Sequence, residues 1–519
     1  MRALFASIVV ALALVASATG QTPLRTPFES TAALTSRNGI DEAVFARLKR
    51  LGLEPARLCS DAVFVRRAFL DVIGTMPTAE EARAFLDDPS PNKRSALIDR
   101  LLDRDEFADY WAMKWGDVLR VKSEFPVNLW PNAVQAYHHW VRTSLRDNLP
   151  YDRFARALLT SNGSNFRVGP ANFYRAAEGH EPKAIATSVA LVFMGSRFGA
   201  WPPERQAQMA AFFSQIGYKA TAEWKEEIVF FDPDKGTRGS VLPGGTTVRL
   251  AASDDPREAF ASWLVSPKNP WFARAAVNRV WFWLMGRGIV HEADDIRPDN
   301  PPSNPELLAY LEREFQASRF DLKALYRLIL NSSTYQLSSI PARPGADAEA
   351  NFAHALVRPL DAEVLVDAVC QITGTAEQYS SAIPEPYTFI PPDQRSIALA
   401  DGSIRSTFLE TFGRPPRDTG LLSERNSTPS ASQRLYLLNS GDIQRKLQQG
   451  PKLQALLQTP GNVRQLVTGI YLAVLSRFPT EDEVKVVAAY GQSPGSNRRQ
   501  AGLDLVWALL NSAEFRFRH

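Results

Sequence analysis

The sequence predicts a mainly α-helical fold in which two helical domains are joined by a short β-hairpin or extended connector. Three observations predict this fold. Apolar residues recur every three or four positions through most of the chain, which is the spacing of one helix face. Runs of β-branched and aromatic residues, separated by turn residues, are concentrated in one short stretch. The chain has 519 residues, 45% of them hydrophobic and 22% charged, which suffices for two or three cored domains.

The first twenty residues have the pattern of a secretory signal peptide. Arg2 is positive, residues 4–15 are mostly apolar, and small residues at 16–18 would allow cleavage. The alternative, a membrane anchor, needs about 20 apolar residues, and neither this run nor any later stretch provides them. We therefore predict export to the periplasm or cell surface, with residues 1–20 removed and no membrane span in the mature chain.

The mature chain is expected to begin with a tether and a helical domain. Residues 21–39 are polar and without periodicity, so we predict a flexible tether. Residues 40–217 have helical spacing, and Thr78 with Glu81 forms the pattern of a capping box at a helix start. The spacing is clear at Val65, Phe69 and Val72, and at Val134, Tyr137, Val141 and Leu145.

The pattern changes after Gly217. Residues 227–231 (EIVFF) and 246–250 (TTVRL) favour β-strands and are separated by Gly, Pro and Asp residues typical of turns. We predict a β-hairpin or extended connector over residues 218–252. Its expected role is to join the two helical domains, although a β-patch that faces carbohydrate would have the same pattern.

Residues 253–519 return to helical spacing and predict a second helical domain. Pro270 and Pro305 mark helix starts, and Gly286 marks a helix end. Residues 377–406 contain four prolines and little periodicity, so we predict a long surface loop. Long loops often carry binding sites.

Charge and motif content exclude several functions. The formal net charge of +3 is too small and too evenly spread for a nucleic-acid partner. Gly-rich phosphate loops and serine-hydrolase motifs are absent from the sequence. The two Cys and six His lack paired ligand spacing, so no metal site is predicted.

His138 and His139 point about 100° apart if helical, which would place one in the core and one at the surface.

Cys59 and Cys370 leave two possibilities open. An oxidising compartment would allow a disulfide if their Cα atoms lay within about 7 Å. Both have apolar sequence neighbours, which favours two buried free thiols equally well.

Long runs in both halves resemble known domains. Residues 66–86 (RRAFLDVIGTMPTAEEARAFL) and 97–120 look like the cytochrome-associated domain of exported planctomycete surface proteins, and residues 269–308 resemble its usual partner domain. Further matching runs are 148–160, 171–175, 320–339, 412–417, 432–440 and 504–515. The resemblance implies two domains of unknown function that often accompany cytochrome c-like modules.

The chain departs from the family at one informative place. Many members carry Cys-x-x-Cys-His, which attaches c-type haem, just after the equivalent of residues 191–195. Here residues 195–206 read GSRFGAWPPERQ and contain neither Cys nor His. We therefore predict no cofactor, and electron transfer would require a separate cytochrome c.

Four residues are candidates for acid–base catalysis. Asp294 and Asp295 are adjacent carboxylates in a polar loop, and paired carboxylates can hydrolyse a glycoside. Glu178 and His180 place a carboxylate beside an imidazole in a second loop. Structural loop ties and solvated loops are the alternatives for both pairs.

A second set of residues is predicted to bind a ligand. Guanidinium groups can hold a carboxylate or sulfate through paired hydrogen bonds, and an exposed tryptophan can stack on a sugar ring. We expect the loop after Asp294 and the loop FGRPPRDTGLLSER to line any ligand site. The candidates are Arg297, Asn300, Arg414, Arg417, Arg425 and Trp201.

The sequence therefore predicts an exported binding or scaffold protein of the cell envelope without its own haem. One alternative is an envelope hydrolase that acts on polysaccharide through paired carboxylates. Another is a docking partner of a separate c-type cytochrome. The expected partners are accordingly envelope proteins, a cytochrome c or polysaccharide.

Overall fold

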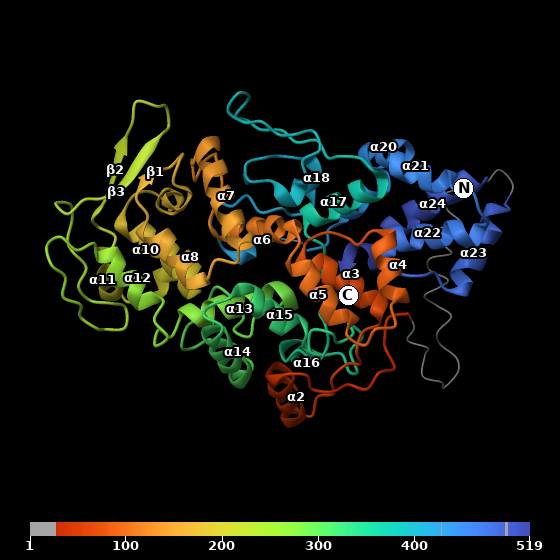
Figure 1. Cartoon of the computed structure of the whole chain (residues 1–519), viewed down its shortest axis with the longest axis horizontal. Coiled ribbons are helices and arrows are strands. Elements are labelled where there is room, and N and C mark those ends of the chain that lie inside the picture. Colours follow the sequence, from red (N-terminus) through yellow and green to blue (C-terminus); the bar gives the residue numbers. More distant parts are fainter. Residues whose placement is uncertain (1–26, 427, 494–496) are drawn as a thin grey trace.

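Helices make up most of the protein, which confirms the prediction of a mainly α fold. The computed structural model describes residues 27–426, 428–493 and 497–519, so the predicted signal peptide lies outside the described residues. Figure 1 shows helices along the whole length of the molecule, with a small sheet at one end. Within the described ranges, no helix combines the length and the apolar character needed to cross a membrane.

The first half of the chain is helical, and several of its helix starts are capped by side chains. Asn38 accepts a hydrogen bond from Ile40 N, and the capping box at Thr78 has both of its hydrogen bonds. The elements of this half are α2 (Gly39–Leu51), α3 (Asp61–Val72), α4 (Ala79–Asp87), α5 (Lys93–Leu102), α6 (Asp105–Val118), α7 (Pro131–Arg146), α8 (Tyr151–Thr160), η1 (Gly169–Ala171), α9 (Asn172–Arg175), α10 (Pro182–Met194), η2 (Phe198–Ala200) and α11 (Pro203–Ala211).

The connector contains a β-hairpin, but only one of its two strands was predicted correctly. β3 (Glu227–Phe231) pairs with β2 (Ile216–Ala220), with Tyr218 opposite Val229, and also with β1 (Gly163–Ser164). The expected strand at 246–250 makes one isolated bridge, from Thr247 to Val241. The intervening Pro-Gly-Gly turn folds this run back on its own neighbours, so it does not reach the sheet.

The second half of the chain is again helical. The Asn304 side chain caps the helix that begins at Pro305, and Gly286 ends a helix with φ 83°, a conformation that glycine adopts readily. The elements are α12 (Pro256–Leu264), α13 (Phe272–Met285), α14 (Pro305–Ala317), α15 (Leu322–Leu330), α16 (Ala346–Ala350), β4 (Arg358–Pro359), α17 (Ala362–Thr373), η3 (Ser396–Ala398), α18 (Thr407–Thr411), η4 (Leu422–Glu424), α19 (Ala431–Asn439), α20 (Gly441–Gln449), α21 (Pro451–Gln458), α22 (Val463–Leu475), α23 (Glu481–Gly491), α24 (Arg498–Leu510), α25 (Ala513–Arg516) and β5 (Phe517–Arg518).

The two helical halves share one apolar core, so the connector is not their only link. The ring of Trp283 in α13 lies 5.5 Å from Trp111 and 5.3 Å from Trp115 in α6, measured between ring centroids. Tyr151 of α8 stacks on Phe272 of α13 at 4.9 Å. Each large aromatic pair of this kind removes apolar surface of both halves from water. The halves therefore stabilise each other.

The described part of the expected tether is bonded to the rest of the fold. Ser30 N donates to Leu58 O at 2.8 Å, and Ser60 N donates to Phe28 O at 3.0 Å. Glu29 is buried beside Cys59. Residues 28 and 30 do not fit the prediction of a flexible tether, because their backbone is hydrogen-bonded to the segment before α3.

The cysteines are both free. Cys59 is buried and Cys370 is partly buried on α17. The structure has no disulfide between them, and of the two thiols only that of Cys59 is fully buried.

The histidine pair on α7 is divided as the helical geometry predicts. His138 is buried, and His139 is exposed. Burial lowers the pKa of His138 to about 3, and the nearby charges of Arg417 and Arg142 act in the same direction. In the unfolded chain this histidine has a pKa near 6.5. Between that pH and about 3, the unfolded chain therefore binds a proton that His138 of the folded chain does not bind.

This difference predicts a pH-dependent stability. As pH falls from 6.5 toward 3, His138 should reduce the free energy of unfolding by up to about 1.4 kcal/mol per pH unit. His138→Gln should flatten the pH dependence measured by urea unfolding much more than His139→Gln does. The same slope in wild type and both variants would contradict the assignment.

Candidate functional site

The two predicted polar loops meet at Asp294. One carboxylate oxygen of Asp294 accepts a hydrogen bond from Leu422 N at 2.7 Å, and the other lies 3.4 Å from Nη2 of Arg279. Asp294 is 3% exposed. Because both oxygens bind protein groups in a buried place, this geometry favours the structural alternative for Asp294 over catalysis.

The remaining candidates of this loop bind one another at the surface. Arg297 pairs with Asp295 at 3.1 Å and with Asp299 at 2.8 Å. Asn300 Nδ2 donates to the backbone oxygen of Asp295 at 2.8 Å. These contacts fix the loop that precedes α14.

Glu178 and His180 have neighbours different from those of Asp294. Glu178 is exposed and lies near the positive charge of Arg120. The His180 ring stacks on Tyr218 with the centroids 3.9 Å apart, and its Nε2 lies 3.9 Å from Glu227. Burial lowers the pKa of His180, although Glu227 opposes the shift. The carboxylate beside this imidazole is thus Glu227, which the sequence did not indicate.

Trp201 covers the end of α10. Its Nε1 donates to Ser196 Oγ at 2.9 Å, and its partly buried ring lies 5.3 Å from that of Phe198. These contacts make Trp201 part of the packing in the segment 195–206.

Three of the four predicted arginines lie in a buried charge cluster. Nε, Nη1 and Nη2 of Arg417 all donate to protein atoms, including Asp117 Oδ1 at 2.9 Å. Arg425 binds Asp117 at 2.8 Å and Glu363 at 2.7 Å. Arg414 Nη2 donates to the backbone oxygen of Asp401 at 2.9 Å. Their side chains are turned inward, so they are poorly placed to bind an external anion.

This buried charge cluster extends across both halves of the chain. Asp361, just before α17, pairs with Lys114 of α6 at 2.9 Å and with Arg518 of β5 at 2.8 Å. Burial alone would raise the pKa of Asp361, but Lys114 and Arg518 hold it well below its usual range. The cluster consists of Asp71, Lys114, Asp117, Arg358, Asp361, Glu363, Arg414, Arg417, Arg425 and Arg518.

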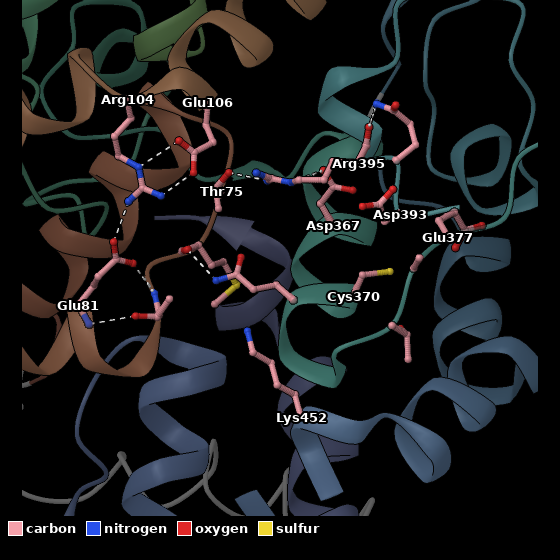
Figure 2. Close-up of a pocket in the computed structure, with 16 residues that line it drawn as sticks. Thr75, Glu81, Arg104, Glu106, Asp367, Cys370, Glu377, Asp393, Arg395 and Lys452 are labelled. Atoms are coloured by element: carbon pink, nitrogen blue, oxygen red, sulfur yellow. Dashed lines mark hydrogen bonds and ion pairs between the residues drawn. The ribbon is translucent and has the colours of Figure 1, made fainter. Parts of the chain in front are cut away.

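The structure also contains a pocket of about 350 Å³, which the sequence did not identify. Figure 2 shows its walls, formed by the segment from α3 to α4, by the start of α6, by α17 and the loop after it, and by α21. The lining residues are Thr75, Met76, Thr78, Glu81, Arg104, Glu106, Asp367, Cys370, Gln371, Thr375, Ala376, Glu377, Asp393, Gln394, Arg395 and Lys452. The predicted long loop 377–406 was the one sequence signal that pointed here.

Asp367 and Arg395 lie at one wall of the pocket. The two Asp367 oxygens accept hydrogen bonds from Ser396 N at 2.8 Å and Ile397 N at 3.2 Å. Burial raises the pKa of Asp367, although Arg395, 3.6 Å away, opposes the shift. Arg395 also donates to Thr75 Oγ1 at 2.6 Å. These bonds attach the long loop to both α17 and the segment before α4.

Two charged side chains that line the pocket are available to bind a ligand. Within the described ranges, neither Asp393 nor Lys452 has a side-chain hydrogen bond or an ion pair, and both are exposed. Figure 2 shows them on different sides of the pocket, with Lys452 projecting from α21. The other charged lining residues have partners in the protein, such as Arg104 with Glu81 at 2.7 Å.

The pocket offers no activated nucleophile at Cys370. Burial raises the pKa of this thiol to about 11, so it stays protonated at neutral pH. In the described part of the chain, no three His, Cys, Asp or Glu side chains are grouped so that they could hold a metal ion. The free charges of the pocket suit the binding of a polar ligand.

Comparison with known families identifies the two halves. Residues 39–199 match PSCyt2, a protein of unknown function (DUF1549), and residues 256–490 match PSD1, a protein of unknown function (DUF1553). This chain belongs to the family that pairs these two domains. Searches of curated proteins and of solved structures found no match.

The pocket and the buried charge cluster both lie at the junction of these regions. The PSCyt2 region supplies the pocket residues from Thr75 to Glu106, and the PSD1 region supplies those from Asp367 to Lys452. The cluster likewise joins Lys114 of the PSCyt2 region to Asp361 of the PSD1 region. A ligand in this pocket would therefore contact both regions.

The buried charge cluster predicts a large effect at Arg425. Arg425→Ala should lower the free energy of unfolding by about 3–5 kcal/mol, because it leaves Asp117 and Glu363 buried without their shared partner. The measurement is unfolding in guanidinium chloride followed by tryptophan fluorescence.

Arg464 provides a matched control for this experiment. It also makes two short bonds to one carboxylate, at 2.7 and 2.6 Å to Glu481, but both of these side chains are exposed. Arg464→Ala should cost far less, because water and salt screen an exposed pair. Equal losses for the two variants would show that the buried cluster contributes no more than a surface pair.

Proposed function

We propose that this protein is an exported binding protein of the cell envelope that holds a small zwitterionic ligand between its PSCyt2 and PSD1 regions. The signal-peptide pattern supports export. The ligand class is inferred from Asp393 and Lys452 in the pocket at the junction. These two side chains have opposite charges, and within the described ranges neither is paired with another protein group.

The chemistry of the pocket supports a ligand with one ammonium and one carboxylate group. Asp393 would accept hydrogen bonds from the ammonium, and Lys452 would donate to the carboxylate. Gln371 and Gln394 line the same pocket and offer amide groups to the rest of the ligand. A volume of about 350 Å³ is at the lower end for small-molecule sites, which suits an amino acid or a short peptide.

The arrangement favours binding over hydrolysis. A general acid must be free to move its proton to the ligand. Asp367 has a raised pKa, but both of its oxygens already accept backbone hydrogen bonds. Asp393 is exposed and has no partner within the described ranges, which suits a group that contacts a ligand.

Calorimetric titration with a dipeptide of alanine tests this proposal. The zwitterionic dipeptide should bind, whereas its N-acetylated amide, which has neither charge, should not. Asp393→Asn and Lys452→Gln should each weaken binding about tenfold, because each removes one charged hydrogen-bond partner.

Lys485→Gln serves as the control substitution. Lys485 is an exposed lysine of α23, away from the pocket lining, and its loss should leave the affinity unchanged. Equal binding of the uncharged analogue, or an affinity that survives both pocket substitutions, would refute the proposal.

A further inference from the structure

Three segments far apart in the sequence bring aromatic rings together at the surface. Trp130 precedes α7, Trp224 lies in the turn between β2 and β3, and Tyr387 belongs to the long loop 377–406. The ring centroid of Trp224 lies 4.7 Å from that of Trp130 and 5.6 Å from that of Tyr387. In Figure 1 the start of α7, the tip of the hairpin and the long loop project on the same side of the molecule. We name Trp130, Trp224 and Tyr387 the aromatic cluster.

The aromatic cluster is open to water. Trp224 is 59% exposed and Tyr387 is 45% exposed. Trp224 is the single exposed tryptophan in the described part of the chain, since the others are buried or partly buried. Phe389, two residues after Tyr387, is 68% exposed. Exposed aromatic side chains gathered from separate loops indicate a binding surface.

The cluster is held in place before any ligand arrives. Lys225 Nζ lies 5.8 Å from the centroid of Trp130 and 5.6 Å from that of Trp224, so one ammonium group contacts both rings. Trp130 has φ 74° and Lys225 has φ 65°, which are unfavourable values for residues other than glycine. Backbone strain at two positions of one surface is typical of a functional site.

We propose that the aromatic cluster binds the sugar rings of a polysaccharide. The face of an aromatic ring carries partial negative charge and attracts the polarised C–H groups on the flat side of a sugar. The planes of the three rings are inclined to one another by 62° to 68°, so they form a concave aromatic surface. The apolar face of a sugar ring can pack against this surface. The sugar hydroxyl groups at the rim remain in water or contact Lys225.

The size and composition of the surface favour a polysaccharide over a protein. Three aromatic side chains present at most roughly 750 Å² when fully exposed, and these are only partly exposed. A standard protein interface needs about 800 Å² from each partner. This inference is independent of the pocket, and it supports the carbohydrate-facing role that the sequence left open for the connector.

Co-sedimentation with insoluble cellulose, chitin, xylan and alginate tests the inference. The full mature chain should sediment with at least one of them. Trp224→Ala and Tyr387→Ala should each lower the binding constant about tenfold, whereas Trp224→Phe, which keeps an aromatic face, should retain most of the binding.

Controls separate the cluster from general hydrophobicity and from the pocket. Leu435→Ala removes an equally exposed apolar side chain of α19 and should leave sedimentation unchanged. Asp393→Asn should also have no effect, so a failure of the zwitterion proposal would not alter this result. Absence of binding to all four polysaccharides, or binding that survives Trp224→Ala, would overturn the inference. A change of oligomeric state in Trp224→Ala, measured by sedimentation velocity, would assign the surface to a second copy of the chain instead.

Discussion

The ion pairs of Asp361 at the start of α17 are the interaction on which the rest of the structure depends. This carboxylate contacts Lys114 from the PSCyt2 region and Arg518 from the end of the chain. Through Arg425 the same cluster reaches Asp117 and Glu363. A buried charge is stable only when its partners are present. The PSCyt2 and PSD1 regions therefore cannot separate without leaving these charged side chains unpaired or exposing them to water. The pocket at their junction is therefore preformed.

Local chemistry made much of the fold predictable. The helices that begin after Thr78 and at Pro305 are started by side-chain caps, and α13 ends at Gly286 because glycine readily adopts the left-handed backbone conformation. Both effects depend only on residues that are near one another in the sequence. The pairing of the strands was harder to predict from the sequence. β2 contains Gly217 and Lys219, so it resembles a strand less than residues 246–250 do, yet contacts with β3 decide the pairing.

The candidate site was less predictable, because its residues meet only through the tertiary fold. A loop rich in arginine has the same sequence pattern whether its guanidinium groups face solvent or, as with Arg417, face a buried aspartate. The pocket combines Thr75 with Asp367 and Lys452, which follow it by about 290 and 380 positions in the chain. The one useful sequence signal was the long loop, which supplies both Asp393 to the pocket and Tyr387 to the aromatic cluster.

Differential scanning calorimetry of the protein tests the central claim most directly. If the shared core and the buried charge cluster make the PSCyt2 and PSD1 regions one cooperative unit, the chain should unfold in a single transition. Its calorimetric enthalpy should then equal its van't Hoff enthalpy. Two separable transitions, or a calorimetric enthalpy well above the van't Hoff value, would show that the regions unfold independently and would contradict this account.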